Sequence, residues 1–134
     1  MSSKKKKTYF LKNHKLNFKK QKFCRCALHV MANNSEQCNR EKLWKTPERY
    51  EKCYNPYTVC AASTRTTTGG KPCYYNFLSM DIPNEEVVAY SHIKYSEYNK
   101  WAKKTGNKLL DEIENTQELR MHLQKWYSIK YKLN

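Results

Sequence analysis

The sequence predicts an α+β fold: a small three-stranded sheet with short helices inserted between its strands, followed by C-terminal amphipathic helices and preceded by a basic extended arm. Three observations support this prediction. Short strand-like stretches occur around Cys24, Val59 and Cys73, apolar residues recur at helical spacing after Pro83, and lysine dominates the first residues. The chain therefore reads as an arm joined to a single folded domain.

The length of 134 residues provides material for one domain and a tail. We place the arm at residues 1–22 and the domain at residues 23–134. Within the domain, residues 23–82 are expected to form a cysteine-pinned core and residues 83–134 its helical part. The mean hydropathy is -1.01, so the aliphatic core is small, and disulfides, a metal or a partner must support it.

The first predicted strand covers residues 23–30, where two-residue alternation places one set of side chains on the inner face: Cys24, Cys26, Leu28 and Val30. Asn34 followed by Gln37 has the spacing of a helix cap and its capping-box partner. This pattern predicts a helix over residues 35–45.

The next stretch alternates turn signals with strand-like residues. Thr46-Pro47-Glu48 predicts a short helix because proline suits the first turn, and Asn55-Pro56 predicts its end because the residue before proline avoids helical conformation. Residues 57–62 and 73–77 are the second and third predicted strands, and residues 66–72 form a turn or hairpin loop between them.

After Pro83 the pattern becomes helical. Glu85 and Glu86 open one helix, and Ser96 caps a second helix that Gly106 ends. Further apolar residues at helical spacing predict one or two amphipathic helices: Leu109, Leu110, Ile113, Leu119, Leu123, Trp126 and Tyr127. We expect these helices to pack on the sheet rather than to form a partner-binding face.

Positive charge is concentrated at the N-terminal end. The formal net charge is +14, and residues 1–23 carry nine lysines and no acidic residue. Aromatic residues lie between these lysines, and a nucleic-acid strand suits such a pattern because lysine neutralises phosphate while aromatic rings stack on bases. A solvated tail or a nuclear-import signal is the alternative. The predicted nucleic-acid contacts are Lys4, Lys5, Lys6, Lys7, Lys12, Lys15, Lys19, Lys20 and Lys22.

Six cysteines lie between residues 24 and 73, and they are metal or disulfide candidates: Cys24, Cys26, Cys38, Cys53, Cys60 and Cys73. No C-x2-C knuckle of the usual zinc type is present. In a strand, the sulfurs of a C-x-C pair project from one face about 7 Å apart, which excludes a bond between them but suits two metal ligands or two disulfides. Cys60 and Cys73 can face this pair, and Cys38 can pair with Cys53.

The cellular compartment bears on the choice among zinc, disulfides and buried thiols. The sequence has no signal peptide and no apolar stretch long enough to span a bilayer, so a cytosolic or nuclear location is expected. Disulfides are rare there, which favours zinc as a possible cofactor. His29, His92 and His122 are available as the base that a catalytic cysteine needs, but no catalytic signature surrounds any of the cysteines. We therefore expect neither an enzyme nor a small-molecule substrate.

Four segments together resemble a known group of proteins: Cys24-x-Cys26, Asn55-Pro56-Tyr57-Thr58-Val59-Cys60, Cys73-Tyr74-Tyr75 and Glu85-Glu86-x-x-Ala89-Tyr90. In this order they resemble small basic cysteine-containing proteins of large nucleocytoplasmic DNA viruses, over residues 22–92. Cys38 and Cys53 are additional to that pattern. The resemblance implies a virion and host-cytoplasm setting. Such viruses carry their own thiol oxidases, which makes disulfides as well favoured as zinc.

These observations lead to three expected functions. The first is a non-enzymatic structural or virion-associated protein whose arm binds nucleic acid. The second is a minor capsid or internal scaffold protein whose arm binds acidic capsid proteins. The third is a zinc-binding transcription accessory. No membrane span is expected in any of them.

Overall fold

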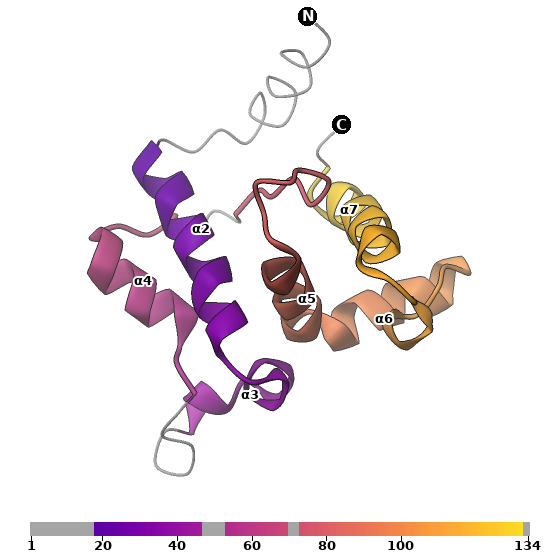
Figure 1. Ribbon diagram of the computed structural model, residues 1–134, viewed down its shortest axis with the longest axis horizontal. Helices are drawn as coiled ribbons and strands as arrows, with labels where there is room; N and C mark the ends of the chain where they lie inside the picture. The colour runs from indigo at the N-terminus through magenta and orange to yellow at the C-terminus, as the bar shows by residue number, and fades with distance from the viewer. Residues whose placement is uncertain (1–17, 47–52, 70–72, 133–134) are drawn as a thin grey trace, which may run out of the picture.

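The structure, a computed structural model, describes residues 18–46, 53–69 and 73–132, and over these residues it contains helices and no strand (Figure 1). The α-helices are α2 (Phe18–Asn33), α3 (Glu36–Glu41), α4 (Pro56–Thr64), α5 (Asn84–Ile93), α6 (Tyr95–Thr105) and α7 (Thr116–Tyr131), and the short 3-10 helices are η1 (Leu43–Lys45) and η2 (Leu110–Glu112). The predicted α+β fold with a three-stranded sheet is therefore wrong.

The first predicted strand, residues 23–30, lies inside α2. The buried residues on this helix are spaced as one helical face requires: Phe23, Cys24, Ala27, Leu28 and Met31. The strand prediction used only every second residue of this pattern. The arm boundary at residue 22 also falls within α2, so the arm is helical from Phe18 onward rather than extended.

The helix predicted over residues 35–45 is confirmed as α3, which is shorter. Its cap is Ser35, whose hydroxyl accepts a hydrogen bond from the Cys38 amide at 3.1 Å. Asn34, the predicted cap, is buried and bonds instead to the backbone of Tyr54, with its amide donating to the carbonyl and its oxygen accepting from the N–H, both at 2.9 Å. It therefore ties the end of α2 to the segment that precedes α4.

The second predicted strand, residues 57–62, is also wrong because these residues belong to α4. The Asn55 side chain accepts hydrogen bonds from the amides of Tyr57 and Thr58, at 2.9 and 3.2 Å, and Pro56 occupies the first turn. The Asn-Pro pair thus begins a helix instead of ending one. The short helix predicted at Thr46-Pro47-Glu48 lies mostly outside the described residues.

Residues 73–77, the third predicted strand, have no strand partner within the described chain. The turn before them is confirmed at Gly69, whose φ of 65° suits glycine, while residues 70–72 lie outside the described part. The helices predicted after Pro83 are confirmed as α5 and α6, and the one or two helices predicted from Leu109 onward are the short η2 and α7. Gly106 ends α6 at φ 75°, although Lys94 rather than Ser96 precedes that helix.

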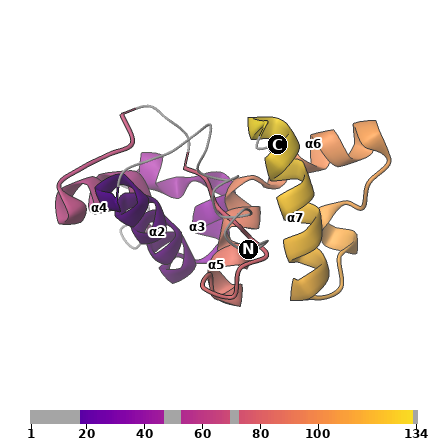
Figure 2. The same cartoon turned by 90° about the horizontal axis from the view of Figure 1, so that it is seen from above.

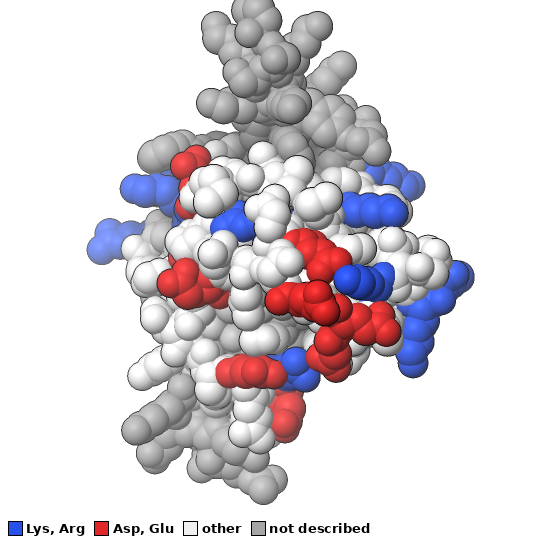
Figure 3. All heavy atoms as spheres, turned by 45° about the vertical axis from the view of Figure 1, so that its right-hand side comes forward, with Lys and Arg blue, Asp and Glu red and all other residues white. Residues whose placement is uncertain are grey.

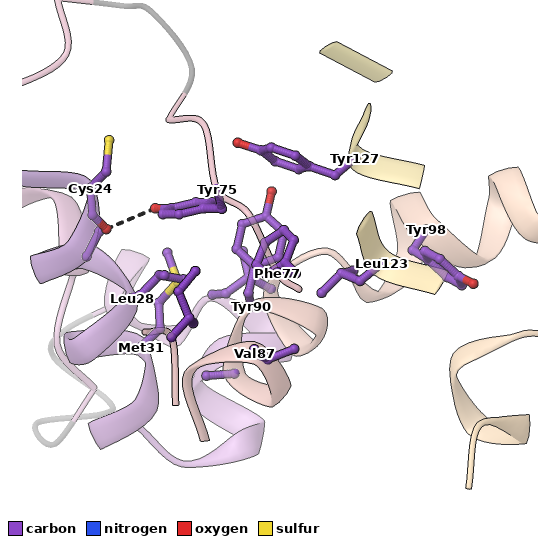
Figure 4. Close-up of a cluster of buried hydrophobic side chains, with 14 of the residues drawn as sticks. Cys24, Leu28, Met31, Tyr75, Phe77, Val87, Tyr90, Tyr98, Leu123 and Tyr127 are labelled. Atoms are coloured by element: carbon purple, nitrogen blue, oxygen red, sulfur yellow. Dashed lines mark hydrogen bonds between the residues drawn. The ribbon is translucent and has the colours of Figure 1, made fainter. Parts of the chain in front are cut away.

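Helix α5 lies in the middle of the molecule, with α2, α3 and α4 on one side and α6 and α7 on the other (Figures 1 and 2). Around it the core is largely aromatic (Figure 4). The Phe77 ring lies 5.0 Å from the Tyr90 ring and 5.3 Å from the Tyr127 ring, measured between centroids. The Tyr75 hydroxyl donates to the Cys24 carbonyl at 3.0 Å. Ring packing therefore compensates for the scarcity of aliphatic residues.

A buried arginine on α7 holds the loop before α5. Arg120 is 2% exposed, and its guanidinium donates to the carbonyls of Phe77 and Ser79 at 2.8 Å and to that of Ile82 at 2.5 Å. It also donates to the Asn84 side chain at 2.9 Å. The guanidinium fork thus supplies donors to the buried carbonyls of Phe77 and Ile82 and a second donor to that of Ser79, which also accepts from the Ile82 amide.

Candidate functional site

The structure describes three of the nine lysines predicted to bind nucleic acid. Lys19, Lys20 and Lys22 lie in the first turns of α2. The other six lie outside the described residues: Lys4, Lys5, Lys6, Lys7, Lys12 and Lys15. The Lys20 ammonium lies 3.9 Å from the position that a β-carbon would take at Gly69, so it sits beside the turn after α4.

Helices α2 and α4 lie side by side and form a basic unit (Figures 1 and 2). Neither helix contains an acidic residue. We call α2, α4 and Arg65, which ends α4, the basic helix pair; its cations are Lys19, Lys20, Lys22, Arg25 and Arg65. The Arg25 guanidinium also donates to the Asp81 carbonyl at 2.6 Å. Cations are therefore gathered on one element pair with no carboxylate of its own to neutralise them.

Three disulfides hold this part of the molecule together. The Cα–Cα distances are 5.6 Å for Cys24–Cys73, 5.8 Å for Cys26–Cys60 and 5.6 Å for Cys38–Cys53. The disulfide alternative is thus confirmed for all six cysteines, and none is free. The C-x-C pair lies on a helix, where residues two apart point to different sides, so α2 is tied to α4 by one sulfur and to the segment before Tyr74 by the other.

Zinc is not supported by this arrangement. In the part of the chain that the structure describes, no group of three or more His, Cys, Asp or Glu side chains could hold a metal ion. The six cysteines are used in disulfides and no longer offer thiolates to zinc. The same pairing leaves no thiol to act as the nucleophile of a cysteine-dependent enzyme.

Each of the three histidines in the folded residues lies near a glutamate. The nitrogen–oxygen distances are 3.5 Å for His29 and Glu86, 4.0 Å for His92 and Glu36, and 3.9 Å for His122 and Glu118. Burial lowers the pKa of His92, although the charge of Glu36 raises it and that of Arg40 lowers it. The first two pairs join neighbouring helices, α2 with α5 and α5 with α3, whereas His122 and Glu118 lie one turn apart on α7.

Carboxylates cluster on another part of the surface (Figure 3). On the face in Figure 3, acidic side chains gather near the centre, while lysines and arginines lie toward the edges. The Arg40 guanidinium lies 2.9 Å from the Glu36 carboxylate, 3.9 Å from the Asp111 carboxylate and 4.0 Å from the centroid of the Tyr95 ring. Glu36 and Asp111 thus have a cationic partner in Arg40, whereas the sequences of α2 and α4 contain no carboxylate.

A second feature, absent from the sequence analysis, lies beside the basic helix pair. A hollow of about 290 Å³ opens between α2, α4, residues 67–68 and 73–75, and the ends of α5 and α7. Its aromatic lining comes from five places in the chain: Phe23, Tyr57, Tyr75, Tyr90 and Tyr131. The only early signal for this tyrosine-lined hollow was the total of eleven tyrosines, which did not say which of them would meet.

The exposure of these rings varies from rim to floor. Tyr57 is 45% exposed and Tyr131 is half-buried, whereas Tyr75 and Tyr90 are buried. Burial raises the pKa of Tyr57 and, more strongly, that of Tyr90. Lys94 also lines the hollow, and its pKa is lowered by burial and then by the charge of Lys42.

Comparisons of the chain with protein-family models, with curated proteins and with solved structures find no match. None of the helices in the described ranges combines the length and the apolar character that crossing a bilayer requires. The candidate site therefore consists of the basic helix pair with the tyrosine-lined hollow beside it.

Proposed function

We propose that this chain is a non-enzymatic, virion-associated protein that binds nucleic acid through its lysine-rich N-terminal end. The observation that carries the proposal is the segregation of charge. Residues 1–23 contain nine lysines and no carboxylate, and the basic helix pair continues this pattern into the folded domain. A surface of one sign attracts a polyanion and holds it by releasing counterions.

The position of these lysines within α2 adds support. The first turn of α2 contains no acidic residue, and Lys19 and Lys20 lie there instead. Cations near a helix N-terminus are disfavoured by the helix dipole, typically by about 0.3–1 kcal/mol each. Helix stability therefore gives no reason for lysines at these positions, whereas phosphate binding does.

The disulfides bear on the proposed location. Chains kept in a reducing cytosol seldom retain disulfides, and here all six cysteines are paired. We propose that the protein is oxidised during virus assembly in the host cytoplasm and is carried into the virion, as the resemblance implies. The cross-links then hold α2 and α4 in place while the lysines contact nucleic acid.

Replacing Lys19, Lys20 and Lys22 with glutamine is expected to weaken nucleic-acid binding and to reduce its salt dependence. Each phosphate contact contributes about 0.7 to the slope of log K against log salt for a single strand. Losing three contacts should therefore reduce the slope by about 2. Fluorescence anisotropy of a labelled oligonucleotide across a salt series measures both quantities, and deletion of residues 1–17 should reduce the slope further.

The matched control replaces Lys100, Lys103 and Lys104 of α6 with glutamine. These three side chains are exposed, and replacing them removes the same charge from a helix at the other end of the molecule. The proposal requires the α6 variant to keep nearly the full salt slope. Equal losses in the two triple variants would mean that net charge alone sets binding and would contradict the assigned site.

A second candidate function is a minor capsid or internal scaffold role, and one observation favours it. The loop before α5 exposes Leu78 at 51% and Met80 at 78%. Arg120 holds this loop through its carbonyls, so two apolar side chains are displayed on a fixed backbone. Rigid exposed apolar groups suit a protein partner better than a polyanion.

Cross-linking in assembled particles separates the two functions. With a photoreactive residue in place of Met80, the scaffold function predicts adducts with capsid protein. With the same residue in place of Lys19, the nucleic-acid function predicts adducts with nucleic acid. Capsid adducts from both positions would favour the scaffold function, and nucleic-acid adducts confined to position 19 would favour the first proposal.

A further inference from the structure

The tyrosine-lined hollow and the basic helix pair adjoin one another. Thr67 and Thr68 line the hollow, and the next residue, Gly69, lies beside the Lys20 ammonium. Lys94 lies in the lining as well. A ligand in the hollow would therefore have aromatic rings around it, Lys94 in the wall, and Lys20 outside the lining but close to Gly69, the residue that follows Thr68.

This combination favours a flat aromatic ligand that is joined to anionic groups. Tyr57 and Tyr131 present partly exposed rings at the rim, and rings of this kind stack on other flat π-systems. A volume of about 290 Å³ is at the lower end of the range for small-molecule pockets, which is roughly 300–1,000 Å³. One ring system with its immediate substituents is thus the appropriate size.

We propose that the tyrosine-lined hollow receives one unpaired base of a single-stranded nucleic acid, with the flanking phosphates on Lys20 and Lys94. This inference rests on the proposed nucleic-acid function and adds a substrate class to it. Bases inside a duplex are stacked and paired, so they cannot enter a side-chain pocket without being extruded. The hollow therefore confers a preference for single strands over duplexes.

The tyrosine-lined hollow has a rigid floor. Its floor residue Tyr75 is buried and is fixed by the hydrogen bond from its hydroxyl to the Cys24 carbonyl (Figure 4). Cys24 is itself bonded to Cys73 in the pocket wall. The disulfide and the hydrogen bond together fix the floor relative to α2, so a base meets a pre-formed surface and little binding energy is lost in ordering it.

The test compares Tyr57→Leu with Tyr54→Leu. Both tyrosines are exposed, at 45% and 53%, and they lie three positions apart, but only Tyr57 lines the hollow. Leucine retains apolar bulk, and Tyr57→Phe retains the ring. The probes are a mixed-sequence DNA single strand of about 10 nucleotides, within the usual site sizes, a fully abasic strand of equal length and the corresponding duplex, all measured by fluorescence anisotropy.

The expected result is a loss of roughly 5- to 100-fold in single-strand affinity for Tyr57→Leu, the range that loss of one stacked base gives. Tyr54→Leu and Tyr57→Phe should bind like the unmodified protein. The abasic strand and the duplex should not respond to Tyr57→Leu, since neither places a base in the hollow. Circular dichroism verifies that each variant is folded.

Three other results would overturn the inference, and they separate it from the proposed function. Equal single-strand affinity of Tyr57→Leu and Tyr54→Leu, with binding still dependent on Lys19, Lys20 and Lys22, would exclude the base pocket and leave the function intact. An equal loss on the abasic strand would assign Tyr57 a purely structural role. Absence of binding to every probe at low salt would exclude the function and the inference together.

Discussion

Removing the Cys24–Cys73 disulfide by changing both residues to alanine is expected to lower the free energy of unfolding by about 3 kcal/mol. Because the Cys26–Cys60 disulfide lies inside this loop and stays intact, the path that the bond closes is the 2 residues from Cys24 to Cys26 plus the 13 residues from Cys60 to Cys73, which is 15 residues. In the chain-entropy description the stabilisation grows with the logarithm of that length. A loss of that size is a large fraction of the roughly 5–15 kcal/mol that stabilises an ordinary domain. Urea denaturation followed by circular dichroism measures it.

The control is the paired change of Cys38 and Cys53 to alanine. Their disulfide closes a loop of 15 residues, so the entropic part of the expected loss is the same, about 3 kcal/mol. The Cys24–Cys73 pair should affect the core more, because it fixes the backbone whose carbonyl accepts the Tyr75 hydroxyl. A loss below about 1 kcal/mol for the Cys24–Cys73 pair would mean that packing alone holds this region.

Replacing Arg120 with methionine is expected to cost about 3–5 kcal/mol of unfolding free energy. The variant removes the guanidinium donor from the buried carbonyls of Phe77 and Ile82, and it leaves the part-buried Ser79 carbonyl with only the Ile82 amide as donor. Methionine fills similar volume, so the cost arises chiefly from lost hydrogen bonds rather than from a cavity. Equilibrium unfolding in urea gives the value, and hydrogen exchange of the loop before α5 should rise as well.

Two variants bracket this result. Arg120→Lys keeps the charge but lacks the planar fork that reaches several carbonyls, so it should recover only part of the stability. Lys125→Met makes an equivalent change at an exposed position of the same helix and should stay within about 0.5 kcal/mol of the unmodified protein. If Arg120→Met and Lys125→Met proved equally stable, Arg120 would have no role in holding the loop.

The C-terminal half of the fold was predictable because its helices carry strong and redundant signals. Buried residues of α7 repeat at helical spacing: Leu119, Leu123, Trp126 and Tyr127. Glu85 and Glu86 complement the start of α5, and Gly106 adopts the left-handed conformation that ends α6. In this half, hydrophobic periodicity, helix capping and helix termination all indicate the same helices, and such agreement makes the structure predictable from the sequence.

The N-terminal half was misread where one local signal admits two structures. The two-residue alternation from Cys24 to Val30 fits a strand. Ala27 and Met31 are buried as well, and with Cys24 and Leu28 they give the three- and four-residue spacing of a helical face. The Asn55-Pro56 pair either ends a helix or caps the next one, and the side chain of Asn55 decides for the cap. Tertiary packing on α5 and the disulfides, neither visible locally, select the helical alternative.

The candidate site was predictable only in part. Lys19, Lys20 and Lys22 belong to a lysine-rich stretch, so composition alone indicated them, whereas Arg65 and Lys94 join the site only through the fold. The tyrosine-lined hollow is assembled from residues as distant as Phe23 and Tyr131, and only the folded chain brings them together. The disulfides were partly predictable from the sequence. Cys60 and Cys73 were among the possible partners of the C-x-C pair, but a zinc site explained the same cysteines equally well, and only the fold shows that they are paired.

Peptide mapping of the unreduced protein by mass spectrometry tests most directly whether disulfides link α2 both to α4 and to the segment before Tyr74. Trypsin cuts after Arg25 and so separates Cys24 from Cys26. An additional cut after Glu36 separates Cys26 from Cys38, and one after Tyr57 separates Cys53 from Cys60. We expect three linked pairs: Cys24 with Cys73, Cys26 with Cys60, and Cys38 with Cys53. Six cysteines that react with an alkylating agent before reduction, or a Cys24 peptide linked to any partner other than Cys73, would contradict the structure on which the site is built.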